Sequence, residues 1–150
     1  MKLQKQTLIA LLATLELARD PARIQSAGEI AATYGISVNH LAKVLRDLGR
    51  AGLVEAVRGV GGGYRFAGNA KRISLHDVID LFGNIVSDAG EIPGPSANTD
   101  IGKGLASVLR EMDEIAIATF KSISLATLLK SLHRDHARTK PASRPAAGAS

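Results

Sequence analysis

The segment 58–63 constrains the fold of this chain most, because it reads Arg-Gly-Val-Gly-Gly-Gly and carries little side chain. The runs on either side of it, 53–57 and 64–67, are rich in branched and aromatic residues, as strands are. We therefore predict a β-hairpin with a slim glycine tip. A phosphate-binding loop is a poor alternative, since such a loop leads into a helix and is usually followed by Lys-Ser/Thr, whereas a strand continues here.

Three helices are predicted before this hairpin, over about residues 2–18, 26–35 and 37–50. In the first, apolar and small residues recur at steps of three and four with no Gly or Pro between them. The second opens with a capping box, Ser26-Ala27-Gly28-Glu29, and ends at Gly35, which can adopt the left-handed conformation that closes a helix. A serine in a capping position precedes the third.

The second and third helices have the spacing of a helix-turn-helix. Ala31 is small enough for the two helices to approach, Gly35 makes the turn, and Leu41 packs the second helix onto the first. With the hairpin after them, they predict a mainly α fold with a small β-hairpin: a winged helix-turn-helix domain over residues 1–85. An ordinary helical hairpin in an unrelated fold is the structural alternative.

The rest of the chain predicts a loop followed by a long helix. A capping box at 74–77 opens a helix to about residue 85, and residues 86–100, which hold several Gly and Pro, form a loop. Asp100 can cap a helix to about residue 120, and a shorter helix follows over 125–132. The basic tail 133–150 is predicted to be disordered.

The long helix carries an apolar seam that steps by four and three residues, which is typical of a dimer interface. We therefore assign residues 101–132 to dimerisation, although any buried helix could show such a seam. The residues of the seam are Ile101, Leu105, Val108, Met112 and Ile115.

The charge is distributed unevenly along the chain. Of the 19 Lys and Arg residues, 11 lie in residues 1–72 with 5 acidic residues, whereas residues 73–132 hold 4 basic residues against 8 acidic ones. The tail is basic again, with 4 against 1. A basic front half favours a module that binds a polyanion such as nucleic acid, although an ordinary protein of basic pI could show the same balance.

The candidate DNA contacts lie on the third helix, the hairpin and the start of the chain. The first turns of a recognition helix face base edges, where Asn can address adenine and Lys can address guanine or phosphate. Arginines beside a slim hairpin tip can enter a minor groove or follow phosphates, and lysines at a helix start can bind phosphates. A solvated polar face is the alternative reading of the helix. The candidates are Ser37, Asn39, His40, Lys43, Arg46, Arg58, Arg65, Lys2 and Lys5.

Other chemistry has little support in the sequence. The chain has no cysteine, which excludes disulfides, thiolate zinc fingers, a cysteine nucleophile and a cysteine-ligated cluster. His133 and His136 lack a third ligand, and no catalytic triad or carboxylate pair stands out, so we expect no metal, no cofactor and no enzyme activity. The apolar run 8–15 is too short to span a bilayer and no cleavage site follows it, so we expect a cytoplasmic protein.

Three stretches of the sequence, 34–44, 57–65 and 73–79, match a known pattern, and the Arg-Gly-x-Gly-Gly-Gly tip is the most specific part of it. Together they resemble the Rrf-two family of bacterial winged-helix regulators, over about residues 1–132. The Asn39-His40-Leu41 sequence with Lys43 is most similar to the family's nitric-oxide-sensing branch.

The resemblance implies a homodimer that crosses its long helices, places two recognition helices in successive major grooves and usually represses transcription. By this match, Asn39, His40 and Lys43 fall where the family reads bases, and Arg58 falls on its minor-groove wing.

This chain also departs from the family's sensing members, which carry three cysteines in the loop before the long helix. None lies in residues 86–104, and Leu8 and Ala106 stand about where some members add a further ligand. The chain therefore resembles the cluster-free members, whose signal is a metabolite or a partner protein.

The sequence thus predicts a homodimeric transcriptional repressor that binds a palindromic operator in double-stranded DNA without an iron–sulfur cluster. A regulatory protein or a small-molecule effector is a further expected partner. Two alternatives remain open: a winged-helix module that docks another protein through its wing, and a regulator controlled by an enzyme bound to its acidic half.

Overall fold

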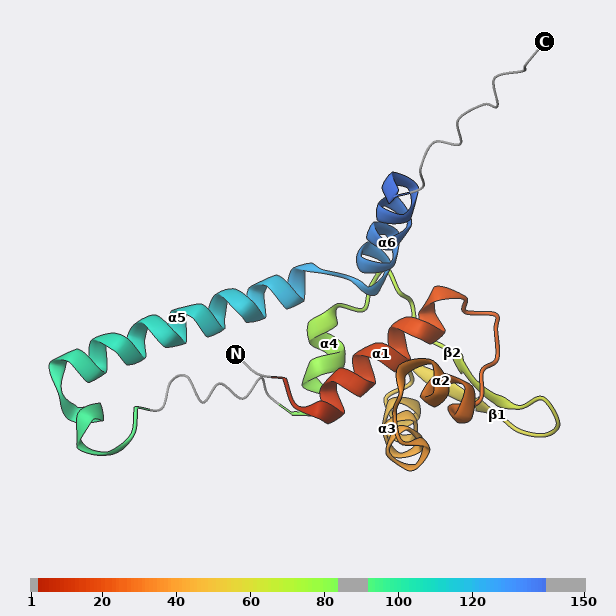
Figure 1. Ribbon diagram of the computed structural model, residues 1–150, viewed down its shortest axis with the longest axis horizontal. Coiled ribbons are helices and arrows are strands. Elements are labelled where there is room, and N and C mark those ends of the chain that lie inside the picture. Colours follow the sequence, from red (N-terminus) through yellow and green to blue (C-terminus); the bar gives the residue numbers. More distant parts are fainter. Residues whose placement is uncertain (1–2, 84–91, 140–150) are drawn as a thin grey trace, which may run out of the picture.

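The computed structural model describes residues 3–83 and 92–139. It confirms the predicted order of helices around one two-stranded hairpin. In Figure 1, α1 to α4 form the body of the molecule, α5 extends from it on one side, and the hairpin projects on the other. The elements are α1 (Lys5–Arg19), α2 (Ala27–Tyr34), α3 (Val38–Arg50), β1 (Val54–Val57), β2 (Gly63–Phe66), α4 (Leu75–Asp80), the 3-10 helix η2 (Gly94–Asn98), α5 (Asp100–Ser122) and α6 (Leu125–Thr139).

The ends of α2 and α3 form as their sequence signals predict. Ser26 caps α2 by accepting a hydrogen bond from the backbone of Glu29, and the Glu29 carboxylate accepts one from the Ser26 backbone in return. Gly35 closes α2 with a φ of 63°, a left-handed conformation that glycine adopts without steric cost. The helix-turn-helix is therefore encoded locally, at both ends of its turn.

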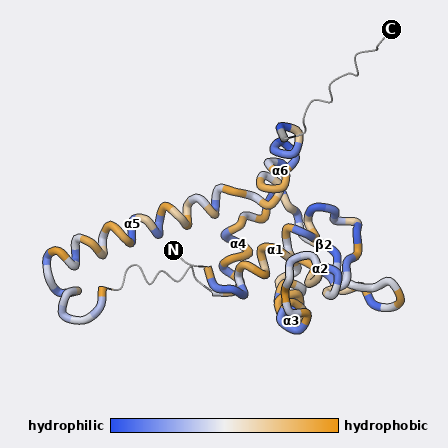
Figure 2. Tube along the Cα trace, viewed as in Figure 1, coloured by the Kyte–Doolittle hydropathy of each residue, from blue (hydrophilic) through white to orange (hydrophobic). Residues whose placement is uncertain are grey.

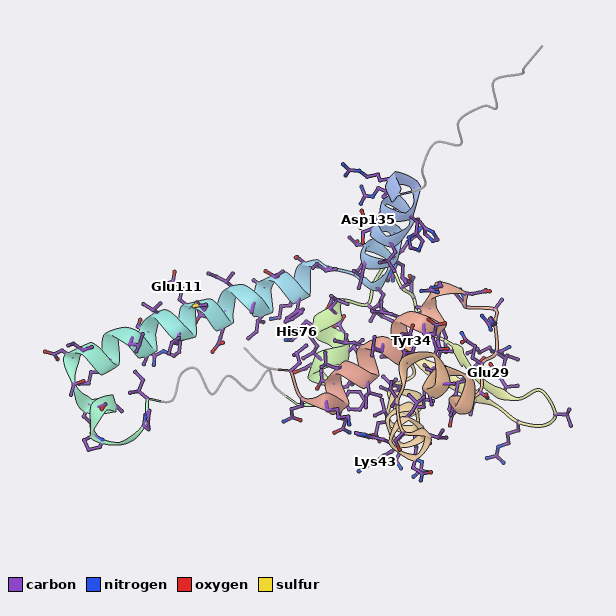
Figure 3. The ribbon with its side chains drawn as sticks, in the orientation of Figure 1. Glu29, Tyr34, Lys43, His76, Glu111 and Asp135 are labelled. Atoms are coloured by element: carbon purple, nitrogen blue, oxygen red, sulfur yellow. The ribbon has the colours of Figure 1, made fainter. Side chains whose placement is uncertain are left out.

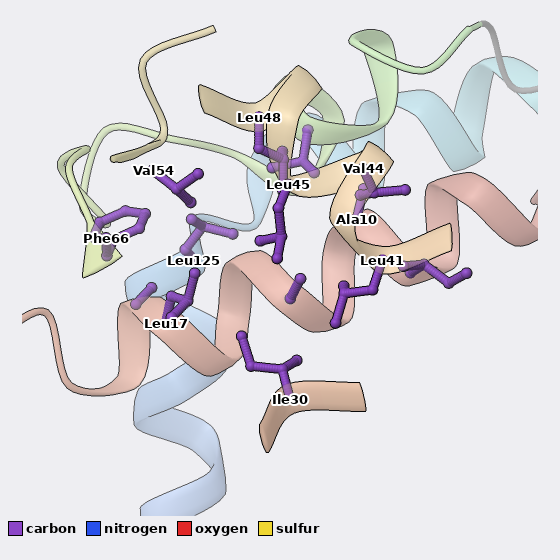
Figure 4. Packing of buried hydrophobic residues seen from close by; sticks show 14 of the residues in the cluster. Ala10, Leu17, Ile30, Leu41, Val44, Leu45, Leu48, Val54, Phe66 and Leu125 are labelled. Atoms are coloured by element: carbon purple, nitrogen blue, oxygen red, sulfur yellow. The ribbon is translucent and has the colours of Figure 1, made fainter. Parts of the chain in front are cut away.

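The hydrophobic core lies between α1 and α3, as Figure 4 shows. Small residues on α1 let α3 approach closely, and larger side chains from α2, α3 and both strands close over them. The buried residues include Ala10, Ala13, Leu17, Ile30, Leu41, Val44, Leu45, Leu48, Val54 and Phe66. This core fixes how the recognition helix and the hairpin lie relative to each other.

The first turn of α6, which lies within the range 101–132 assigned to dimerisation, also belongs to the core. Leu125 is fully buried in the cluster. The backbone at the start of α6 pairs with the segment before α4, where Leu75 N donates to Ile123 O and Leu125 N donates to Ile73 O, both at 2.9 Å. The body of the molecule therefore includes the start of α6, and α5 is a long excursion between two parts of it.

The C-terminal helix also differs in length from the expectation. The sequence predicts its end near residue 132 with a disordered tail over 133–150, whereas α6 continues to Thr139. No Gly or Pro interrupts residues 125–139, and Pro141, which disfavours helical backbone in the residue before it, comes only afterwards. Residues 140–150 of the predicted tail lie outside the described part of the chain.

Smaller differences lie around the predicted loop. α4 ends at Asp80 instead of about residue 85, and Gly83 has a φ of 111°. Thr99, not Asp100, caps α5, since its hydroxyl accepts a hydrogen bond from Gly102 N at 3.0 Å. Asp100 occupies the first helical turn, where a carboxylate interacts favourably with the helix dipole. Within residues 3–83 and 92–139, no helix is both long and apolar enough to cross a bilayer.

The hairpin is attached to the body by a third segment of backbone. β1 and β2 pair antiparallel with Val54 opposite Phe66 and Val57 opposite Gly63. Gln25, in the loop before α2, exchanges two backbone hydrogen bonds with Tyr64, at 2.9 and 2.8 Å. This contact brings the Gln25 backbone so close to Gly63 that a Cβ added there would lie 2.4 Å from the Gln25 carbonyl oxygen.

We expect Gly63→Ala to destabilise the fold by about 1–3 kcal/mol, because the added methyl group forces two paired backbone segments apart. Gly28→Ala in α2 is the matched control: its Cβ would make only an ordinary contact at 3.8 Å, and alanine favours the helix. Urea unfolding followed by circular dichroism measures both. A Gly63→Ala variant as stable as the parent would mean that the loop before α2 does not anchor the hairpin.

Candidate nucleic-acid interface

The α3 helix presents one apolar and one polar face. Its apolar residues, among them Leu41 and Leu48, are buried against the body. Asn39, Lys43 and Arg46 follow one another at steps of four and three, and all three are exposed. Figure 3 shows Lys43 on the side of α3 away from α6. Three of the predicted DNA contacts, Asn39, Lys43 and Arg46, therefore share one open face of a helix whose other face is packed against the body.

Two of the predicted contacts on α3 have structural partners at its start. The Ser37 hydroxyl accepts a hydrogen bond from His40 N at 3.4 Å and caps the helix. The His40 side chain is half-buried, unlike the exposed Asn39 and Lys43. Ser37 thus fixes the first turn of α3, in addition to being available at the surface.

The hairpin tip presents one arginine and one large apolar residue to solvent. Arg58 and Val60 are both exposed, and Gly59 and Gly61 adopt φ values of 101° and 76°, which turn the chain in little space. Arg65, by contrast, lies opposite Glu55 in the ladder, and the two side chains form an ion pair. The charge of Arg65 is therefore offset within the hairpin, and Arg58 carries the uncompensated charge of the tip.

The lysines predicted at the start of the chain are only partly within the structure. Lys5 is the first residue of α1 and is exposed. Lys2 lies outside the described residues. Lys5 therefore stays a predicted phosphate contact, on a different element from the predicted base readers of α3.

One basic residue of this surface was not predicted from the sequence. An open groove between α3 and the hairpin is lined by Arg46, Arg50 and Arg58, together with Tyr64. Arg50 lies 3.8 Å from Asp47 in an exposed ion pair, a weak interaction in water. Position 50 follows Lys43 and Arg46 at the next step of the same helical stripe, so helical spacing would have identified it.

The seam of α5 is exposed along the whole helix in the single chain. Gly102 is the one residue of α5 that is buried, whereas Ile101 is 85% exposed and Met112 61% exposed. Figure 2 shows the hydrophobic residues recurring along this helix, away from the body. Apolar patches of this kind are typical of interaction surfaces, so the seam is a candidate interface.

A polar contact joins α1 to the end of α2. The Tyr34 hydroxyl donates to the Glu16 carboxylate at 2.5 Å, and Arg19 lies 3.9 Å from the same oxygen. Burial and the neighbouring Glu16 raise the pKa of Tyr34 from 10.0 to about 12. The neutral phenol is therefore the form that the folded chain favours.

This shift predicts a loss of stability in strong alkali. The stabilisation is complete below pH 10, the unfolded value, and decreases as the pH rises towards 12, because the unfolded chain releases the proton first. We expect Tyr34→Phe, which has no such proton, to lose less stability than the parent over this interval. Urea unfolding at successive pH values, with Tyr64→Phe as the matched control, tests this. If both variants lost the same free energy of unfolding between pH 10 and 12, the pKa of Tyr34 would not be raised by the fold.

The residues of this chain do not fit an iron–sulfur cluster. Cluster-ligating thiolates are absent, since no position in the sequence is cysteine. Among residues 3–83 and 92–139, no three His, Asp or Glu side chains are grouped so that they could hold a metal ion. Leu8 and Ala106 are hydrocarbon side chains that cannot ligate iron.

Comparison with known proteins places the chain in a family. A family model named Rrf2 and described as an iron-dependent transcriptional regulator matches residues 3–131. The HTH-type transcriptional regulator BadM of Rhodopseudomonas palustris is 51% identical over 140 residues, which are 93% of this chain and 88% of BadM. Protein aau3 of Rhizobium meliloti is 33% identical over 135 residues, or 87% and 86% of the two chains.

Solved structures agree with the sequence comparison. IscR of T. potens superposes with a TM-score of 0.71 at 25% identity, covering 90% of each chain. CymR of B. subtilis, described as the global cysteine regulator, superposes with a TM-score of 0.68 over 87% of this chain and 98% of that one. At 21% identity, the CymR match shows the fold alone.

The match to the family model spans most of the chain, and BadM shares half of its residues with it over nearly its whole length. The winged helix-turn-helix and the exposed basic stripe of α3 agree with this assignment. The chain is therefore a DNA-binding transcriptional regulator, not an enzyme, and it belongs to the Rrf2 family, the Rrf-two regulators that its sequence resembles.

Proposed function

We propose that this regulator is a homodimeric repressor that binds a palindromic operator and uses no iron–sulfur cluster. The stripe of Asn39, Lys43 and Arg46 on the open face of α3 is the observation that carries the proposal. It supplies side chains that can read bases on a helix that protrudes from a rigid body. A repressor of transcription acts on the chromosome, which in a bacterium lies in the cytoplasm.

The exposed seam of α5 supports the dimer. Two copies related by a twofold axis bury the same five residues against each other, which satisfies both seams at once. Two recognition helices related in this way read two half-sites of opposite orientation, and half-sites of such dimers lie roughly 34–36 Å apart. The residues assigned to DNA and those assigned to the dimer lie on different elements, so each can be tested alone.

The test of the proposal is capture of genomic fragments by the purified protein, followed by sequencing. We expect a small set of fragments that share an inverted repeat, whether or not cell extract is added. Capture that requires extract would favour control by a bound enzyme. Capture of no shared sequence under either condition would favour the protein-docking alternative.

The protein should be colourless when purified with or without oxygen, and it should bind its operator in that state. The reason is that the chain has no thiolate to hold a cluster. Visible absorption spectra and an iron assay on the same preparation measure this. Visible absorption with stoichiometric iron would contradict the prediction, and apo-protein that binds DNA only after iron is supplied would contradict it equally.

A further inference from the structure

A cleft lies between α1 and α6, on the opposite side of α1 from α3. Two adjoining cavities form it, of about 230 and 320 Å³, and both are lined by Arg19, Leu129 and Leu132. The larger cavity lies within the range of small-molecule sites. Leu125 holds the start of α6 in the core. The rest of α6 points away from the body, as Figure 1 shows, and the cleft lies between it and α1.

The inner part of the cleft is apolar. Leucines from α1 and α6 face each other across it, and the ring of Tyr34 closes its end. Leu12 and Leu132 remain 38% and 43% exposed, so apolar surface is left in water at this place. A ligand with a hydrocarbon body would remove that surface from water, at about 25 cal/mol for each Å² buried.

The outer part of the cleft carries the positive charge of Arg19. Arg19, whose side chain is 56% exposed, and His133 lie at its mouth. Glu16 is the acidic residue of the lining, but its side chain is only 11% exposed and already receives the Tyr34 hydroxyl. Arg19 lies 3.9 Å from Glu16, a contact too long to be a hydrogen bond, so its guanidinium N–H groups remain available to bind a carboxylate through two parallel hydrogen bonds.

The lining of the cleft reaches the turn of the helix-turn-helix at Tyr34. Tyr34 is the last residue of α2, and the left-handed Gly35 and the cap at Ser37 follow it directly. A ligand that packs against the Tyr34 ring therefore contacts the turn between α2 and the recognition helix. The hydrogen bond from Tyr34 to Glu16 ties that point to α1, which forms the other wall.

We propose that the cleft between α1 and α6 binds a small carboxylic acid with an apolar body, and that binding weakens operator affinity through Tyr34. The acid would be the signal that this cluster-free regulator senses, a role that rests on the proposed function. The charge of the mouth, the leucine lining and the cavity size together favour such an acid over a partner helix, for which α5 already offers a longer apolar surface.

Binding is tested on the full-length protein without DNA, by calorimetry with octanoate as the probe and octan-1-ol as its neutral counterpart. We expect octanoate to bind once per chain, and Arg19→Gln to weaken it about 10-fold while leaving octanol unchanged. Arg23→Gln, in the exposed loop after α1, is the matched control and should bind octanoate as the parent does. Leu132→Asp, at an exposed position that tolerates a charge, should abolish binding of both probes.

The coupling is tested by titrating operator DNA with and without saturating octanoate. We expect the operator dissociation constant of the parent to rise at least about 5-fold, within the usual range of allosteric coupling. Tyr34→Phe should still bind octanoate but should lose most of this rise, because it lacks the hydrogen bond to Glu16.

Three results would overturn the proposal: no octanoate binding, binding that both Arg19→Gln and Leu132→Asp leave unchanged, or binding without effect on the operator. A change of oligomeric state in Leu132→Asp, with no octanoate binding in the parent, would assign the cleft to a protein contact instead. Octanoate binding to a chain that captures no DNA would support the site and contradict the proposed function, so the two failures are distinguishable.

Discussion

A double change in the seam of α5, Val108→Asp with Met112→Asp, is expected to convert the dimer into monomers and to weaken operator binding at least about 100-fold. Each large side chain that is fully buried contributes roughly 1.5–3 kcal/mol before entropy is subtracted, and a dimer buries two copies of each. The change also places four carboxylates at one interface, where burying a charge costs several kcal/mol more. A loss of about 2.7 kcal/mol already corresponds to 100-fold.

The single chain should survive this change, because Val108 and Met112 are 53% and 61% exposed in it. Circular dichroism should therefore report unchanged helicity, while sedimentation reports the monomer mass. Ser107→Asp with Ala118→Asp adds the same charge at exposed positions on another side of α5 and should leave the dimer intact. A seam variant that remains a dimer with full operator affinity would place the interface elsewhere.

The second large effect separates base readers from phosphate binders. Replacing Lys43 or Asn39 by Ala should cost about 1–3 kcal/mol on the operator and little on random DNA, because both lie on the exposed face of the first turns of α3. Arg58→Ala should weaken binding most where the flanks are A·T-rich, since a side chain in a narrow minor groove reads groove width.

Lys5→Ala is expected to behave differently. It should weaken operator and random DNA alike and reduce the salt slope by about one for each phosphate that is no longer neutralised, hence about two per dimer. Lys103→Ala, on α5 away from the interface, removes the same charge and should change neither duplex. Titrations of operator and scrambled duplexes at several salt concentrations measure all of these variants. If every variant bound both duplexes as the parent does, the basic front half would serve a partner other than DNA.

The helix-turn-helix and the hairpin could be predicted because their signals are local. The capping box before α2 involves residues three apart, and the turn at Gly35 depends on that residue's own conformation. The glycines of the hairpin tip, residues 59–63, likewise predict a tight turn from their own composition. Such features need no knowledge of the rest of the fold.

The features that the sequence did not reveal depend on contacts between distant segments. Leu125 is apolar like its neighbours 128 and 129, and its burial follows from backbone pairing between residues 73–75 and 123–125. The ion pair of Arg65 with Glu55 depends on the exact register of the hairpin. The cleft between α1 and α6 exists only because two helices from opposite ends of the chain diverge from a shared contact, which no local pattern records.

The anchoring of the hairpin by Gln25 has a consequence for how operators of this regulator can vary. The loop before α2 pairs with the hairpin and leads directly into the helix-turn-helix. The hairpin and the recognition helix are therefore held in a fixed arrangement, and they contact DNA as one unit. In a dimer built on α5, the spacing between the two DNA-binding bodies depends on that helix and on how it joins the body. The distance between half-sites and the sequence of each half-site then depend on different parts of the chain. A substitution in α5 can change the distance between half-sites without changing the sequence that each half-site needs.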